Sequence, residues 1–161
     1  MTRSMSSGAA AEAAVTAGGW STTSGDAVRA WGRLGYPRRA QRLHAAATAI
    51  RDQHGGLAPA DHDALLALPG VGAYTAAAVA SFAHGRRHVV LDTNVRRVLA
   101  RLEGGVAFPP ASLNRAETLR AKAWLPEDPA QAARWAAASM ELGALVCTAD
   151  APRCGDCPVT D

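Results

Sequence analysis

The chain has 161 residues, of which 48% are apolar and only 5% aromatic, and it carries a net charge of +3. This length fits one compact domain or little more, and an apolar fraction rich in alanine favours closely packed helices. The mildly basic charge permits a polyanionic partner, although an ordinary solvated surface has the same balance. No run of about 18 apolar residues and no signal-peptide pattern occurs, so we expect no membrane span and a cytoplasmic protein, nucleoid-associated if bacterial.

Residues 1–25 are rich in Ser, Ala, Gly and Thr, and we expect them to be disordered or at most a frayed helix at Ala9–Ala17. Beyond them, apolar residues recur with the helical period between glycine, proline and capping signals. No β pattern and no internal repeat occurs, so we predict an all-α fold. The expected helices run from Ser24 or Asp26 to Trp31, Arg38 to His54, Ala60 or Asp61 to Leu68, Ala73 to His84, Asp92 or Thr93 to Leu102, Ser112 or Asn114 to Trp124, and Ala130 to Leu145.

Two of these helices have apolar faces that we expect to be buried. In the second helix the face consists of Ala40, Leu43, Ala47 and Ile50. In the last helix small residues indicate close packing, and the face consists of Ala132, Trp135, Ala136, Ser139, Met140 and Gly143.

The segment 68–75, Leu-Pro-Gly-Val-Gly-Ala-Tyr-Thr, places a glycine-bearing turn directly before an alanine-rich helix. Glycine adopts positive φ and allows close approach of another backbone. The N–H groups of such a turn and of the first helical turn lack partners, and with the helix dipole they form an anion site suited to a DNA phosphate. A plain pair of helices joined by a turn is the alternative. Asp92 stands about twenty residues further on, at the head of the next helix.

Three cysteines lie near the end of the sequence with the spacing Cys147-x6-Cys154-x2-Cys157. Together with the turn and Leu91-Asp92-Thr93-Asn94-Val95, they make the chain resemble the helix-hairpin-helix DNA glycosylases, most closely the adenine DNA glycosylases, over roughly residues 24–158. The resemblance implies a glycosylase domain over residues 26–125, and a last helix with a partial iron–sulfur loop over 126–161. It implies double-stranded DNA containing a mispair as partner. The implied substrate- or DNA-binding residues are Tyr36, Leu68, Gly70, Val71, Gly72, Tyr74 and Thr75.

The resemblance also assigns chemistry to single residues. Asp92 matches the aspartate that stabilises positive charge on the sugar when the N-glycosidic bond breaks, although an aspartate here is also an ordinary helix cap. Tyr74 stands where strand-cleaving relatives have a Schiff-base lysine, so hydrolysis alone is expected. Alternatively, Tyr74 is a surface residue of its helix. Tyr36 matches a wedge beside the mispaired 8-oxoguanine, with packing inside a glycine turn as the alternative.

Basic side chains are candidate phosphate contacts, with a solvated surface as the alternative for each. They are Arg38, Arg39, Arg86, Arg87, Arg96, Arg97 and Arg101. Three histidines lack metal-ligand spacing, and we expect them at the surface or at helix caps: His62, His84 and His88.

The resemblance implies a [4Fe-4S] cluster bound by Cys147, Cys154 and Cys157, with a fourth cysteine that would fall beyond Asp161. A zinc site is the alternative, but a fourth ligand is not evident. Residues 1–25 do not match the family helix that carries the general-acid glutamate. We therefore expect a chain truncated at both ends and catalytically impaired. The alternatives are a thymine/guanine mismatch glycosylase and a non-catalytic DNA-binding remnant.

Overall fold

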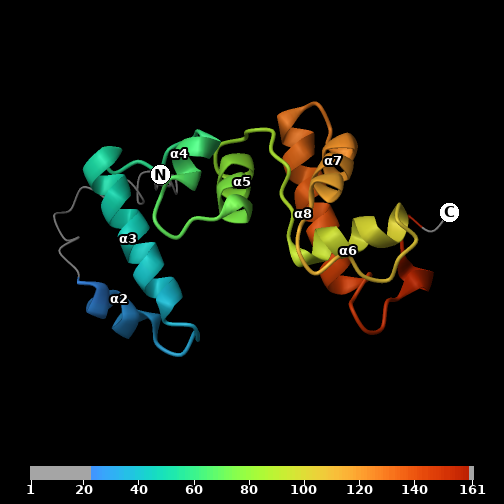
Figure 1. Cartoon of the computed structure of the whole chain (residues 1–161), viewed down its shortest axis with the longest axis horizontal. Helices are drawn as coiled ribbons and strands as arrows, with labels where there is room; N and C mark the ends of the chain where they lie inside the picture. Colours follow the sequence, from blue (N-terminus) through green and yellow to red (C-terminus); the bar gives the residue numbers. More distant parts are fainter. Residues whose placement is uncertain (1–22, 160–161) are drawn as a thin grey trace, which may run out of the picture. The chain divides into compact units, whose positions relative to one another are not determined.

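The computed structural model describes residues 23–159, and Figure 1 shows their helical arrangement. No strand occurs in this range, which confirms the predicted all-α fold. The expectations for residues 1–22 lie outside the described part of the chain. No described helix is long and apolar enough to cross a membrane. The helices are α2 (Ser24–Trp31), α3 (Arg38–Gln53), α4 (His62–Leu66), α5 (Ala73–Phe82), α6 (Thr93–Leu102), α7 (Arg115–Trp124) and α8 (Pro129–Leu145), followed by the 3₁₀ turn η1 (Cys154–Asp156).

Side-chain caps set the beginnings of several helices. In α2 the cap is Thr23 rather than Ser24 or Asp26: its hydroxyl accepts from the Asp26 N–H at 3.2 Å, and its own N–H donates to the Asp26 carboxylate at 2.8 Å. Asn114 and Glu117 form the same reciprocal capping box at α7. The α8 helix begins at Pro129 behind Asp128, because proline is favoured at the first helical position.

The described residues divide into two compact units, which we describe separately. The first unit comprises 23–59 and 67–71, and the second comprises 60–66 and 72–159. In the second unit α8 packs against α6. The domain boundary predicted between 125 and 126 stays a prediction.

In the first unit, α2 packs on α3 and buries mainly alanine. The expected face of α3 was partly wrong, because Ala46 and Ala49 are buried while Leu43 is 61% exposed. The eight residues of α2 are half as many as those of α3. Because both helices rise equally per residue, α2 is too short to cover the whole length of α3.

The core of the second unit joins α5, α6, α7 and α8. Val90 and Val95 are fully buried, and Trp135 and Met140 of α8 pack against both of its apolar clusters. The expected close-packing face of α8 is confirmed, since its small residues are buried: Ala132, Ala136, Ser139 and Gly143. This packing places the beginning of α6, with Asp92, beside the end of α8.

Candidate functional site

The helix-hairpin-helix element consists of α4, a short turn and α5. Asp61 caps α4 by accepting the N–H groups of Asp63 at 3.1 Å and Ala64 at 2.9 Å. In the turn, the Val71 N–H donates to the Leu68 carbonyl at 3.1 Å, and the Leu68 side chain is buried. The helix before the turn ends at Leu66, two residues earlier than expected.

The two glycines of the turn have different roles. Gly70 has φ of +75°, and a Cβ there would lie 2.6 Å from the Cβ of Arg42, so no other residue fits without displacement. Gly72 has an extended φ of −99° and open space around it, and it is the N-cap of α5. Because Gly72 provides no side-chain cap, the first N–H groups of α5 remain available to an anion.

Tyr74 and Thr75 occupy the exposed first turn of α5, and Val71 is half-buried. The Tyr74 ring is 43% exposed. An exposed Tyr74 could contact DNA, or it could be a surface residue without a role in binding. The role of Tyr74 therefore stays a prediction.

Asp92 is the N-cap of α6, and both of its carboxylate oxygens are engaged. One oxygen accepts the Val95 N–H at 2.7 Å, and the other accepts the Asn94 side-chain amide at 3.2 Å. The amide oxygen of Asn94 in turn accepts from Arg97 at 2.9 Å. The carboxylate is therefore held in one orientation while its residue remains half-exposed.

Arg97 connects this network to the end of α8. It is buried, and its guanidinium also donates to the main-chain carbonyls of Gly143 at 2.6 Å and Cys147 at 2.8 Å. These are carbonyls at the carboxyl end of a helix, which lack intrahelical partners. The position of Asp92 thus depends on contacts nearly fifty residues away in the sequence.

Tyr36 stands out from the loop between α2 and α3. It is 81% exposed and has φ of +48°, the only non-glycine residue with positive φ in the described chain. The loop is closed beneath it by a hydrogen bond from the Trp31 indole to the Gly35 carbonyl at 2.9 Å. The ring is therefore not packed inside the glycine turn, and a strained, exposed aromatic residue is a candidate for function.

Four of the seven predicted phosphate-contacting arginines instead bind groups within the protein, which corrects the expectation. Arg87 donates to the carbonyls of Leu125 and Pro126, Arg97 is buried, and Arg101 donates to carbonyls of the loops at 107 and 148–149. Arg38, Arg39 and Arg86 are exposed. The sequence analysis missed Arg42, although its spacing of four residues from Arg38 places both on one side of a helix.

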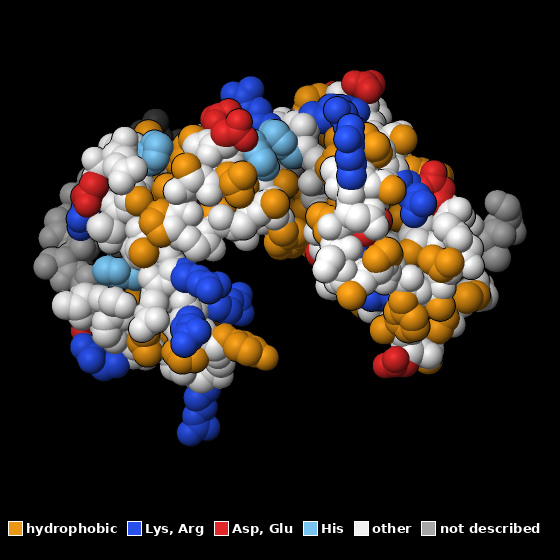
Figure 2. Space-filling view, viewed as in Figure 1, with side chains coloured by type: hydrophobic (Ala, Val, Ile, Leu, Met, Phe, Trp, Pro, Cys, Tyr) orange, Lys and Arg blue, Asp and Glu red, His pale blue; other side chains and the backbone are white. Residues whose placement is uncertain are grey.

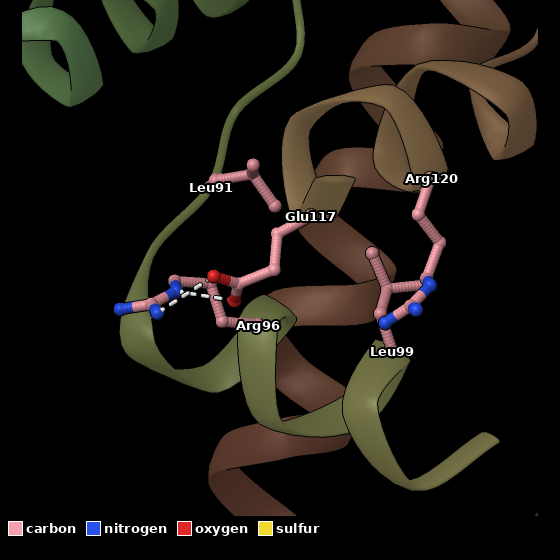
Figure 3. A pocket seen from close by; sticks show the side chains of 5 residues that line it. All are labelled: Leu91, Arg96, Leu99, Glu117 and Arg120. Carbon is pink, nitrogen blue, oxygen red and sulfur yellow. Dashed lines mark hydrogen bonds and ion pairs between the residues drawn. The ribbon is translucent and has the colours of Figure 1, made fainter. Parts of the chain in front are cut away.

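Arg96, the fourth, forms a nearly buried ion pair with Glu117 at 2.9 Å. Figure 3 shows the pair in a small pocket that Leu91, Leu99 and Arg120 also line. The hydrogen bond from Arg96 is the main reason that the pKa of Glu117 lies below its usual value. The Arg96–Glu117 pair connects α6 to α7, and Arg120 is paired with Glu103 at 2.8 Å.

The histidines correct a second expectation. The rings of His62 and His88 stack with centroids 4.8 Å apart, and both residues are half-buried rather than at the surface. Burial, and next the neighbouring His62, lower the pKa of His88.

The three cysteines lie in one loop region after α8. Cys154 is the first residue of η1 and Cys157 is its C-cap, and the Cys157 N–H donates to the Cys154 carbonyl at 3.2 Å. Cys147 Sγ accepts from Arg101 at 3.3 Å. The donors have the chemistry of an iron ligand set, but among residues 23–159 no three His, Cys, Asp or Glu side chains converge on one point.

Comparison with known proteins adds to this geometry. A family model described as helix-hairpin-helix motif matches residues 53–82. The chain is 52% identical over 135 residues to the adenine DNA glycosylase of Mycolicibacterium smegmatis, a match that covers 84% of this chain and 45% of that protein. The chain belongs to the adenine DNA glycosylase family. It is also 42% identical over 130 residues to human adenine DNA glycosylase, covering 80% of this chain and 24% of the human protein.

Solved structures support the family assignment. The chain resembles a thermostable thymine-DNA glycosylase with a TM-score of 0.70 and 28% identity, covering 85% of this chain and 63% of that one. It resembles endonuclease III in a non-covalent DNA complex with a TM-score of 0.72 and 26% identity, covering 86% and 63%. The chain spans less than half the length of the two adenine DNA glycosylases described above.

Proposed function

We propose that this chain binds double-stranded DNA and acts in base-excision repair, in the hydrolysis of the N-glycosidic bond of adenine mispaired with guanine or 8-oxoguanine. One observation carries the proposal: the 52% identity to an adenine DNA glycosylase over 135 residues, a match long enough to include most of the described chain. The hairpin with its open α5 amino end and the anchored Asp92 supply matching chemistry. A cytoplasmic location accompanies this proposal.

Asp92 is the proposed catalytic carboxylate. Breaking the glycosidic bond leaves positive charge on the sugar, and a fixed carboxylate nearby lowers the energy of that charge without reorganising. The Val95 N–H and the Asn94 amide hold the carboxylate in place. Asp92 can cap α6 and also act in catalysis, because each carboxylate oxygen keeps a lone pair that its hydrogen bond to Val95 or Asn94 does not use.

Tyr74 determines the proposed reaction type. A phenol cannot form the Schiff base that a lysine forms with an opened sugar, so water is the nucleophile and the DNA strand stays intact. Tyr36 is the proposed wedge, since its exposed ring is available to stack in the gap left by a flipped base.

The decisive experiment measures base release in single turnover on a duplex with an adenine:8-oxoguanine pair. We expect adenine release that Asp92→Asn abolishes, because the variant lacks the carboxylate charge that stabilises the developing positive charge on the sugar. Cleavage of the DNA strand without alkali treatment would contradict the proposal that Tyr74 limits the reaction to hydrolysis. Release unchanged in Asp92→Asn would contradict the role of Asp92.

A thymine/guanine mismatch glycosylase is the second candidate, favoured by the structural likeness to a thymine-DNA glycosylase. The same assay on a guanine:thymine duplex separates the two: thymine release without adenine release would favour this candidate. Salt-dependent binding with no release from either duplex would favour a non-catalytic DNA-binding role.

We also propose Cys147, Cys154 and Cys157 as ligands of a [4Fe-4S] cluster, on the basis of their number and spacing. The thiols would have to rearrange to converge, and no step of the reaction above depends on the cluster. Iron and sulfide content, together with visible absorbance of the purified protein, test this assignment. Loss of bound iron in Cys154→Ser but not in a surface serine variant is the expected result.

A further inference from the structure

Positive charge in the first unit is not balanced by nearby acid groups. The described residues of this unit, 23–59 and 67–71, contain two acidic side chains, Asp26 and Asp52. Each of them is paired with a neighbouring arginine, Arg29 or Arg51. The exposed arginines that remain are Arg33, Arg38, Arg39 and Arg42. Figure 2 shows basic side chains gathered over the start of α3 and the loop before it, a surface that attracts a polyanion.

Arg38 and Arg42 share one side of α3. Residues four apart lie on the same helix face, about 6 Å apart along the axis. Arg39 is turned about 100° away from Arg38 and lies over the Trp31 ring, 5.5 Å from its centroid. The first turn of α3 contains no acidic residue and no side-chain cap, so the helix dipole adds positive potential at this end.

Arg42 is held against the hairpin turn within the same unit. A Cβ built on Gly70 would lie 2.6 Å from Cβ, 2.8 Å from Cγ and 3.0 Å from Cδ of Arg42, so the aliphatic stem passes directly over the glycine. The guanidinium begins one bond beyond Cδ and therefore lies close to the turn. Gly70 precedes the N-cap of α5 by two residues. The missing side chain at Gly70 thus provides the space for an arginine.

We propose that Arg42 binds a DNA phosphate beside the hairpin turn, with Arg38 extending this contact by one helical turn. This inference rests on the proposed function, because it takes duplex DNA as the partner. A guanidinium binds phosphate oxygens with two parallel hydrogen bonds, and a stem already packed on Gly70 loses little further freedom on binding. The contact orients the duplex and carries no base specificity.

The test measures binding of a short undamaged duplex by fluorescence anisotropy over roughly 50–200 mM salt. Arg42→Met keeps the stem on Gly70 and removes the charge. We expect binding weaker by on the order of tenfold at low salt, and a log–log salt slope smaller by about 0.9, the value for one phosphate contact. The matched control is Arg51→Met on the same helix, which removes the same charge from an arginine already paired with Asp52.

A salt slope unchanged in Arg42→Met, or an equal loss in Arg51→Met, overturns the assignment, since net charge alone would then explain the effect. If the wild-type chain shows salt-dependent duplex binding and Arg42→Met has the same affinity and salt slope, this inference fails and the proposed function stands. If the wild-type chain shows no salt-dependent binding, both fail. Equal urea midpoints for wild type and variant verify that folding is unaltered.

Discussion

Gly143 of α8 lies against Asn94 of α6 so closely that a Cβ on the glycine would be 2.7 Å from the Asn94 Cβ and 3.0 Å from its carbonyl oxygen. Asn94 is also the residue whose amide holds the Asp92 carboxylate. A close contact between the two helices is therefore adjacent to the proposed catalytic group, so a change in the packing of Gly143 affects the position of Asp92.

Gly143→Ala should destabilise the protein. Alanine is favoured over glycine inside a helix by about 1 kcal/mol, but overpacking typically costs about 1–3 kcal/mol. The atoms that would have to move are the Cβ and the main-chain carbonyl of Asn94, and not the end of a flexible side chain. We expect a lower urea midpoint and slower base release. Gly155→Ala is the control, because nothing lies within 4 Å of its added Cβ. A midpoint raised by Gly143→Ala would show that α6 and α8 separate easily.

Arg97→Met should cost about 2–4 kcal/mol of unfolding free energy, since it leaves two main-chain carbonyls at the end of α8 and the Asn94 amide oxygen without their donor. Arg134→Met, at an exposed position of α8, is the control and should stay within about 0.5 kcal/mol. Chemical denaturation measures both. Equal and small losses of unfolding free energy in the two variants would mean that water donates hydrogen bonds to the carbonyls in place of the Arg97 guanidinium.

The Arg96–Glu117 pair predicts a dependence of stability on pH. Its hydrogen bond lowers the folded-state pKa of Glu117 below the ordinary value of 4.5. The stabilisation is thus complete above that value and is lost as pH falls through the folded-state pKa. Glu117→Gln should be less stable than wild type at neutral pH, and the difference should shrink on acidification below 4.5. A difference independent of pH would show that the carboxylate charge contributes nothing.

Tyr36→Gly should separate stability from DNA binding. Relief of the positive φ recovers about 1–2 kcal/mol, against about 0.5–1 kcal/mol for the added flexibility of glycine, so stability should be unchanged or slightly higher. Binding to a mispaired duplex should weaken, because the wedge is gone. Leu34→Gly, in the same loop with a 68% exposed side chain, adds flexibility without relieving strain and should lower stability. Binding unaffected by Tyr36→Gly would exclude the wedge role.

Much of the secondary structure could be predicted because its determinants are local. The caps at Asp61, Asp92 and Asn114 act on N–H groups two or three residues ahead, and the small-residue face of α8 repeats with the helical period. The helix-hairpin-helix fold and the family followed from contiguous motifs of the same kind.

The tertiary structure decided what the arginines do. Arg97 reaches carbonyls 46 and 50 positions away, and Arg96 reaches Glu117, 21 positions away. Charge and helical period are the same for a buried arginine and for one that meets a phosphate, so no local pattern distinguishes them. The apolar Leu43 was misassigned for a related reason, since a periodic pattern does not show which apolar positions another part of the chain covers.

The sequence by itself therefore determined the helices, most of their caps and the turn with Gly70, because each depends on neighbours within a few residues. Only the tertiary structure decided that Arg42 lies over Gly70, and that Arg97 binds the Gly143 and Cys147 carbonyls beyond the network of Asp92. Those relationships join segments far apart in the chain, and they exist only once packing has brought the segments together.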